Sequence, residues 1–126
     1  MGRFAKSFRD LEVYKNGMVL AVEIHEFCKT LPAEERYSFA DQMRRASRSV
    51  CANISEAWRK RRYLAAFVSK LSDAETEAAE IQAWLDFCLR LKYMRSEQDN
   101  DFDSRYERIL SQLVRMIREP QKWCTM

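Results

Sequence analysis

The chain has 126 residues, of which 47% are hydrophobic and 33% charged, and it carries a net charge of +3. This length suits one domain, which we place over residues 1–126. Gly and Pro number two each, too few for a β-sheet protein, which needs turn residues about every 8–12 positions. The composition therefore excludes a sheet-based fold and predicts an all-α protein of long helices with short connections.

The first predicted helix covers residues 9–29, with Asp10 as its N-cap and Leu31-Pro32 just beyond its end. Its apolar residues recur every three or four positions in two adjacent stripes, so the apolar face is broader than a two-stranded coiled coil requires. Gly17 stands inside the first stripe, where its low helix propensity indicates the close approach of another helix. The two stripes are Val13, Gly17, Leu20, Ile24, Phe27 and Leu31, and Leu11, Tyr14, Met18, Ala21, His25 and Cys28.

The second predicted helix covers residues 38–58 and is rich in small residues, which allow tight packing. Asn53 takes a position where an apolar residue would fit the pattern, and a buried amide must find hydrogen-bond partners. We predict a polar network of Arg45, Asn53 and Glu56 that fixes the packing register, with a ligand site as the alternative. The core stripe of this helix is Phe39, Met43, Ala46, Val50, Asn53 and Ala57.

The third and fourth predicted helices cover residues 63–91 and 97–118. Ser96 and Asp99 form a Ser-x-x-Asp start for the fourth helix, and Pro120 ends it. Four helices joined by short loops favour an antiparallel up-down-up-down four-helix bundle. The core stripes are Phe67, Leu71, Ala74, Ala78, Ile81, Leu85 and Cys88 in the third helix, and Phe102, Tyr106, Ile109, Leu113 and Met116 in the fourth.

The chain has no run of about 18 apolar residues, so we expect no membrane-spanning helix and no membrane partner. Residues 1–6 lead into no apolar segment, so we expect no signal peptide. The four cysteines are widely spaced without a CxxC pair, and three of them lie on predicted apolar faces. We interpret them as buried thiols in a reducing compartment, which predicts a cytoplasmic protein.

The basic residues gather in one part of the chain and the acidic residues in another. Residues 44–62 include seven basic residues and a single acidic residue, Glu56, whereas acidic residues predominate from residue 63 to 103. Arginine clusters bind phosphate well, and Trp58 and Tyr63 flank the basic run, where they could stack on bases. The alternative is a solvated helix end, where cations complement the helix C-terminus. The predicted nucleic-acid-binding residues are Arg44, Arg48, Arg59, Lys60, Arg61 and Arg62.

Other polar residues do not have the pattern of a catalytic or metal site. His25 is the single histidine, it borders an apolar face, and no nucleophile elbow accompanies it. Asp73, Glu77 and Glu80 share a flank of the third helix, but di-metal bundles place Glu-x-x-His pairs on inward positions, and this helix carries no histidine. We therefore expect no enzyme activity, no bound metal and no cofactor.

Several segments carry motifs of a known family: Phe8-Arg9-Asp10-Leu11-Glu12-Val13-Tyr14, Leu31-Pro32, Glu35-Arg36-Tyr37, Gln42-Met43-Arg44-Arg45-Ala46, Ser49-Val50, Asn53-Ile54-Ser55-Glu56-Ala57-Trp58 and Arg61-Arg62-Tyr63. On these motifs, residues 8–91 resemble the four-helix-bundle family of 23S rRNA-intervening sequence proteins, and the last helix matches by pattern alone. Many members have Gly where this chain has Ala57, and a further Gly before the basic pair. Because Arg59 and Lys60 fill this junction here, we expect the second helix to extend further.

The resemblance implies an antiparallel four-helix protomer that closes into a homopentameric ring, as relatives do. Some members are encoded inside insertions in ribosomal RNA genes. A related branch, the accessory variability determinant of diversity-generating retroelements, binds a reverse transcriptase and its template RNA. The resemblance therefore implies RNA or DNA and a reverse transcriptase as candidate partners.

Two hypotheses of function remain open at this point. In the first, a non-enzymatic homo-oligomer serves as an RNA-associated accessory module, with the basic residues contacting phosphates. In the second, the protein is a scaffold in which the same arginines pair with the acidic flank of a neighbouring subunit, without nucleic acid. An enzyme would need clustered titratable groups in a cleft, which the sequence does not indicate.

Overall fold

The computed structural model describes residues 5–124, which are helical with no strand. The sequence forms these helices where its apolar residues keep a period of three to four positions. Within residues 5–124, three short 3-10 helices accompany them, namely η2 (Phe8–Asp10), η3 (Ala33–Glu35) and η4 (Pro120–Lys122). The long helices are α1 (Glu12–Cys28), α2 (Phe39–Arg59), α3 (Leu64–Arg90) and α4 (Ser96–Arg118).

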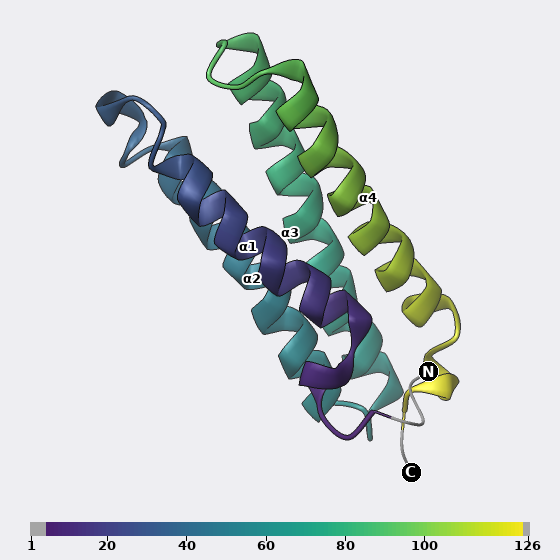
Figure 1. Cartoon of the computed structure of the whole chain (residues 1–126). Coiled ribbons are helices and arrows are strands. Elements are labelled where there is room, and N and C mark those ends of the chain that lie inside the picture. The colour runs from purple at the N-terminus through teal and green to yellow at the C-terminus, as the bar shows by residue number, and fades with distance from the viewer. Residues whose placement is uncertain (1–4, 125–126) are drawn as a thin grey trace.

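The four long helices pack side by side as a bundle (Figure 1). The loops that join α1 to α2 and α3 to α4 lie at one end of the molecule, and the α2–α3 junction lies at the other end. α2 packs most extensively on α3, followed by α3 on α4 and α1 on α2. α1 and α4 share the smallest contact of these neighbouring pairs, so the seam between them is the loosest.

The core follows the stripes that the sequence indicates. Every residue of the α3 and α4 stripes is buried. In α2 the stripe is buried apart from the half-buried Phe39, and in the first stripe of α1 the exception is Leu31. Gly17 is buried, and a Cβ atom there would lie 3.3 Å from Cys51 Sγ and 3.7 Å from Val50 Cγ1. The close approach predicted at this glycine is therefore between α1 and α2.

The start of α1 differs from the prediction. α1 begins at Glu12, and its N-cap is Leu11, without a side-chain cap. Asp10 instead belongs to η2: its carboxylate accepts backbone hydrogen bonds from Lys6 (2.8 Å) and Ser7 (3.1 Å), while Ser7 caps the other end of this capping box. These hydrogen bonds hold the pKa of the Asp10 carboxyl below its usual value. Asp10 is therefore a capping residue, but it belongs to the capping box of η2 and is not the N-cap of α1.

The start of α4 also differs from the prediction. α4 begins at Ser96, and its N-cap is Arg95, without a side-chain hydrogen bond. The predicted Ser-x-x-Asp start therefore lies one position inside the helix. The Asp99 carboxylate has a buried Oδ1 without a hydrogen-bond partner among the described residues, and burial raises its pKa.

The cysteine thiols of the described chain are free. Cys28, Cys51 and Cys88 are buried, and Cys124 is partly exposed. Burial raises the pKa to about 11 for Cys28 and Cys51 and to about 12 for Cys88, so these three thiols are protonated at neutral pH. Within residues 5–124, no helix combines the length and the apolar character needed to cross a membrane.

Candidate nucleic-acid interface

The basic turn between α2 and α3 lies at one end of the bundle (Figure 1). α2 continues to Arg59, one residue further than the predicted end, and the next residues turn tightly. The Lys60 N–H donates to the Ala57 carbonyl and the Tyr63 N–H to the Lys60 carbonyl, both at 2.9 Å. This geometry leaves most of the junction side chains exposed to solvent, namely those of Arg59, Lys60, Arg62 and Tyr63.

Arg61 differs from its neighbours because it packs on the protein. Its guanidinium carbon lies 3.5 Å from the centroid of the Trp58 ring, and its Nε donates to the Trp58 carbonyl at 2.8 Å. Burial, together with the charge of Arg59, lowers the pKa of Arg61. Trp58 is only 5% exposed and is covered by Arg61, so its predicted stacking on a base is wrong. Tyr63 remains as the exposed aromatic side chain of the junction.

The positive charge of the junction is not neutralised by neighbouring acids. Among the described residues, Arg59, Lys60 and Arg62 form no ion pair. The nearby acid Glu56 instead pairs with Lys70 of α3 at 3.0 Å. A hollow of about 100 Å³ opens at the turn, lined by Trp58, Arg59, Arg61 and Arg62. The junction can therefore receive an anionic group from solution.

Arg44 and Arg48 lie far from the junction. At a rise of about 1.5 Å per residue, Arg44 precedes Arg59 by roughly 22 Å along α2. An Arg48 guanidinium nitrogen lies 3.3 Å from His25 Nδ1, and Arg44 lines a separate hollow beside the α1–α2 turn. The structure therefore separates Arg44 and Arg48, in the first half of α2, from the four cations at and beyond its C-terminal end.

The three residues of the predicted polar network have separate partners. The Asn53 amide donates to the carbonyl (3.0 Å) and the hydroxyl (3.1 Å) of Ser49, one turn back in α2. Arg45 bonds Gln42, and Glu56 pairs with Lys70. Asn53 is buried and bonded within its own helix, so the structure has three separate contacts in place of one network.

Sequence reasoning missed Arg36 and Lys29, which line the same hollow as Arg44. Their positions in the chain gave little signal, because the turn between α1 and α2 has no run of basic residues. The turn itself brings them together: Leu31-Pro32 ends α1, and η3 then leads the chain back to α2.

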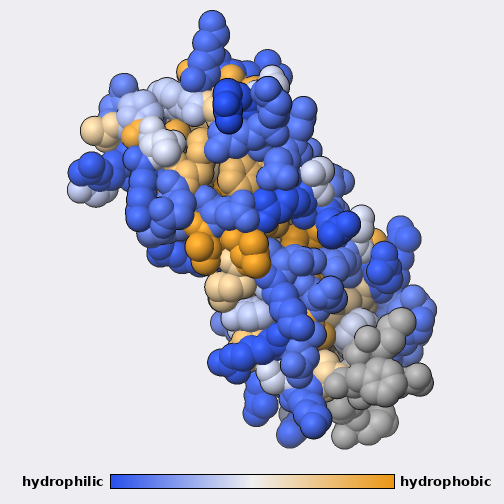
Figure 2. Space-filling model, viewed as in Figure 1, coloured by the Kyte–Doolittle hydropathy of each residue, from blue (hydrophilic) through white to orange (hydrophobic). Residues whose placement is uncertain are grey.

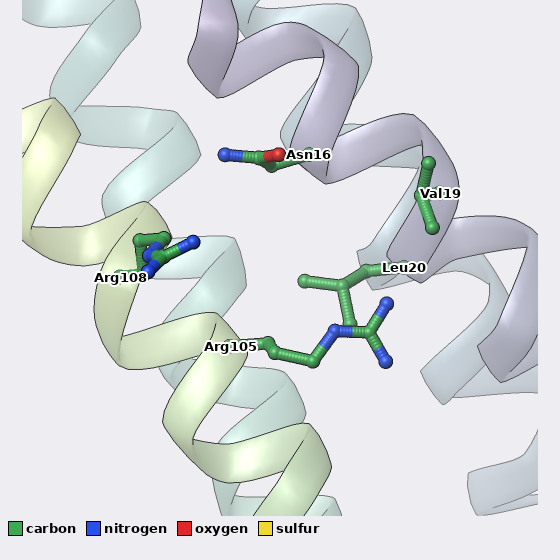
Figure 3. A pocket seen from close by; sticks show the side chains of 5 residues that line it. All are labelled: Asn16, Val19, Leu20, Arg105 and Arg108. Carbon is green, nitrogen blue, oxygen red and sulfur yellow. The ribbon is translucent and has the colours of Figure 1, made fainter.

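A further pocket, of about 110 Å³, lies in the seam between α1 and α4. Figure 3 shows Asn16, Val19 and Leu20 on α1 opposite Arg105 and Arg108 on α4. Arg105 is paired with Glu23 at 2.6 Å and with Asp101 at 3.0 Å. Arg105 is thus already neutralised, and among the described residues only Arg108 brings an unpaired cation to this pocket, whereas the junction has three.

Titratable groups do not gather into a metal site in the described part of the chain. No group of three or more His, Cys, Asp or Glu side chains among residues 5–124 could hold a metal ion. His25 contacts Arg48 at the surface between α1 and α2.

The described residues form long helices packed around an apolar core, with an exposed basic turn between α2 and α3. This architecture is that of a four-helix-bundle protein. Residues 9–115 match the family model described as 23S rRNA-intervening sequence protein, so the chain belongs to this family. The chain is also similar to a solved structure from Bacteroides thetaiotaomicron, a protein with unknown function from the S23 ribosomal protein family. The two are 30% identical, with a TM-score of 0.77 over 84% of this chain and 95% of the other. No curated protein matches the chain.

Proposed function

We propose that this protein is a non-enzymatic accessory module that binds RNA through its junction surface, which comprises Arg59, Lys60, Arg62 and Tyr63. The observation that carries the proposal is the group of exposed cations, which have no acidic partner among the described residues. Arginine forks bind phosphate oxygens, and the exposed Tyr63 ring offers a face for a base. The family description names an intervening sequence of 23S rRNA, which supports RNA as the nucleic acid.

We also propose that the bundle is an antiparallel up-down-up-down protomer of a homo-oligomer, a pentameric ring. Support comes from an apolar patch on the outer side of α1, formed by Met18 (41% exposed), Val19 (52%) and Val22 (56%). Figure 2 shows apolar surface exposed over the face on which α1 lies. Grouped apolar residues of this kind mark interaction sites more often than isolated ones do.

The oligomer proposal is tested by light scattering on the native protein. The double variant Val19→Glu/Val22→Glu should lower the mass to that of the 15.0 kDa chain, because buried unpaired charges oppose association. The matched control Phe87→Glu/Leu91→Glu adds two glutamates at equally exposed apolar positions at the end of α3 (52% and 49%) and should keep the native mass, with circular dichroism as the check that both variants fold. A wild-type protein that is monomeric at all concentrations contradicts the proposal.

The RNA proposal is tested by binding to a structured RNA between 50 and 200 mM salt, a range over which phosphate contacts weaken by orders of magnitude (about 10³–10⁵ for 6–10 contacts). The variant Arg59→Gln/Arg62→Gln should bind more weakly and reduce the salt slope by about 2, one for each lost phosphate contact. The control Arg90→Gln/Arg95→Gln has the same net charge and changes exposed residues at the α3–α4 loop, at the end of the bundle opposite the junction. If the wild-type protein shows no salt-sensitive binding, the RNA proposal is wrong.

The scaffold alternative makes a different prediction for the same variant. If the junction cations pair with exposed acids of a neighbouring α3, such as Asp73 and Asp86, then Arg59→Gln/Arg62→Gln should break the oligomer. If the junction binds RNA, the variant should keep its native mass and lose RNA affinity. Light scattering with and without RNA separates the two.

A further inference from the structure

A hollow at the α1–α2 turn, at the end of the bundle opposite the junction, is lined by three cationic residues, Lys29, Arg36 and Arg44. The hollow measures about 250 Å³. Lys29 and Arg36 reach it from the turn and Arg44 from α2, while the nearly buried Cys28 closes it on the inner side. Two cationic side chains of the turn and one of α2 thus line the same hollow, which is open to solvent.

The charge around this hollow is strongly unbalanced. The side chains of Arg36 and Arg44 form no hydrogen bond or ion pair with residues 5–124, and Lys29 is paired at 3.2 Å with the exposed Glu26. Of the acids on the turn, Glu35 is engaged elsewhere, since it accepts hydrogen bonds from Ser38 (2.8 Å) and Tyr93 (3.0 Å).

The remaining charged groups near the hollow do not offset this excess. Glu34 and Asp41 are exposed and do not line it. Arg48, one turn beyond Arg44, adds a further cation beside His25. Arg44 and Arg48 both act to lower the pKa of Cys28, but burial outweighs them and raises it to about 11, so the thiol contributes no negative charge.

The size and charge of the hollow select the kind of anion. It is smaller than the pockets of about 300–1,000 Å³ that enclose drug-sized ligands, so it suits a single charged group. Guanidinium groups bind carboxylate and phosphate, but a carboxylate carries one charge, whereas a phosphate monoester carries about 1.5 to 2 at neutral pH. Two unpaired arginines and a lysine match the doubly charged group better. An internal phosphodiester would have to bring both flanking nucleosides into the same space.

We propose that the hollow formed by Lys29, Arg36 and Arg44 binds a phosphate monoester, such as the terminal phosphate of an RNA strand. The RNA source rests on the function proposed for the junction, whereas the phosphate site itself rests on the hollow alone. Arg48 and Arg59 are about three turns apart and so share the outer side of α2. A strand whose terminal phosphate occupies the hollow can therefore follow this side of α2 to the junction.

The first arm of the test uses inorganic phosphate alone. At equal ionic strength, phosphate should raise the melting temperature of the full-length protein above its value in chloride, because a ligand that binds the folded state stabilises it. The variant Arg36→Gln/Arg44→Gln should lose this shift, and Arg90→Gln/Arg118→Gln should keep it. Arg36→Gln alone, at an exposed position of the turn, provides the measurement if the double variant does not fold.

The second arm compares one short RNA with a 5′-phosphate and with a 5′-hydroxyl. We expect the phosphorylated form to bind the wild-type protein and the control about tenfold more tightly, and the hollow variant to bind both forms equally. Equal binding of the two RNAs by the wild-type protein, with no melting shift in phosphate, overturns the site while leaving RNA binding at the junction intact. If the melting shift depends on Arg44 but the protein binds no RNA, the phosphate site stands and its ligands are small phosphate monoesters. The proposed RNA function is then wrong.

Discussion

The seam between α2 and α3 differs in chemistry from the seam between α1 and α4. α2 and α3 share the largest contact of the bundle, and their facing stripes are almost entirely apolar and buried. α1 and α4 share the smallest contact among neighbouring helices and are bridged at the surface by Arg105 with Glu23 (2.6 Å) and by Asn16 with Gln112 (3.4 Å). The exposed apolar patch lies on α1. Stability is therefore concentrated in α2 and α3, and α1 presents the side suited to a partner.

The largest expected effect is a core truncation in α3. Ile81 is fully buried, so Ile81→Ala should lower the free energy of unfolding by about 2–5 kcal/mol, through lost burial and the cavity that remains. Val19→Ala, in the α1–α4 seam, should change it by less than about 0.5 kcal/mol because that side chain is half exposed. Urea unfolding measures both variants. Similar losses for both would contradict the contrast between the seams.

A smaller effect is expected where α1 approaches α2. Gly17→Val should lower the free energy of unfolding by about 1–3 kcal/mol, because even a Cβ atom would lie 3.3 Å from Cys51 Sγ. Cys51→Ala in the same chain should recover part of this loss by vacating the space. A double-mutant cycle by urea unfolding gives the coupling energy. Independent, additive losses would show that the contact between the two side chains is not the cause.

The sequence predicts the bounds of a helix well where the periodicity of its apolar residues is unbroken. α2, α3 and α4 begin and end within one residue of the predicted bounds, because long periodic stripes leave little choice of register. The start of α1 was three residues too early, since Asp10 fits two roles equally well in a sequence. The Asp10 carboxylate caps backbone N–H groups in either case, and only the fold shows that these are the N–H groups of Lys6 and Ser7, at the start of the 3-10 helix that precedes α1.

The site was less predictable than the fold, because it depends on which segments meet in space. Arg44 and Arg59 belong to one charge run in the sequence, yet roughly 22 Å of helix separates them. Arg36, outside that run, joins Arg44 at the turn. The sequence also could not show that Arg61 covers Trp58, since an arginine three residues after a tryptophan can equally point to solvent.

The polar bridge of the α1–α4 seam provides a pH-dependent prediction. The hydrogen bonds from Arg105 hold the pKa of Glu23 below its usual value, so the pair stabilises the fold above the unfolded pKa of about 4.5, and this contribution is lost as pH falls through the lower, folded pKa. Both side chains are partly exposed, at 43% and 31%, which limits the contribution to below about 1 kcal/mol.

Glu23→Gln should therefore lower the free energy of unfolding by less than about 1 kcal/mol at pH 7, and the difference from wild type should vanish at low pH. Glu34→Gln, an exposed glutamate of η3 outside this seam, is the matched control and should change little at either pH. Urea unfolding at several pH values follows the difference. A constant difference at all pH values would mean that the charge of Glu23 is not responsible.

The smallest expected effect is at the end of α3, which closes differently from the end of α1. Lys92 has φ of 63°, its N–H donates to the Leu89 carbonyl, and the Tyr93 N–H donates to the Cys88 carbonyl, the arrangement of a Schellman motif. A side chain in this left-handed conformation costs about 1–2 kcal/mol, while glycine adds entropy to the unfolded chain worth about 0.5–1 kcal/mol. Lys92→Gly should therefore raise the free energy of unfolding by a few tenths to about 1 kcal/mol. Lys29→Gly, at the end of α1 with φ of −66°, should lower the free energy of unfolding. Thermal unfolding measures both variants, and we expect their melting temperatures to shift in opposite directions.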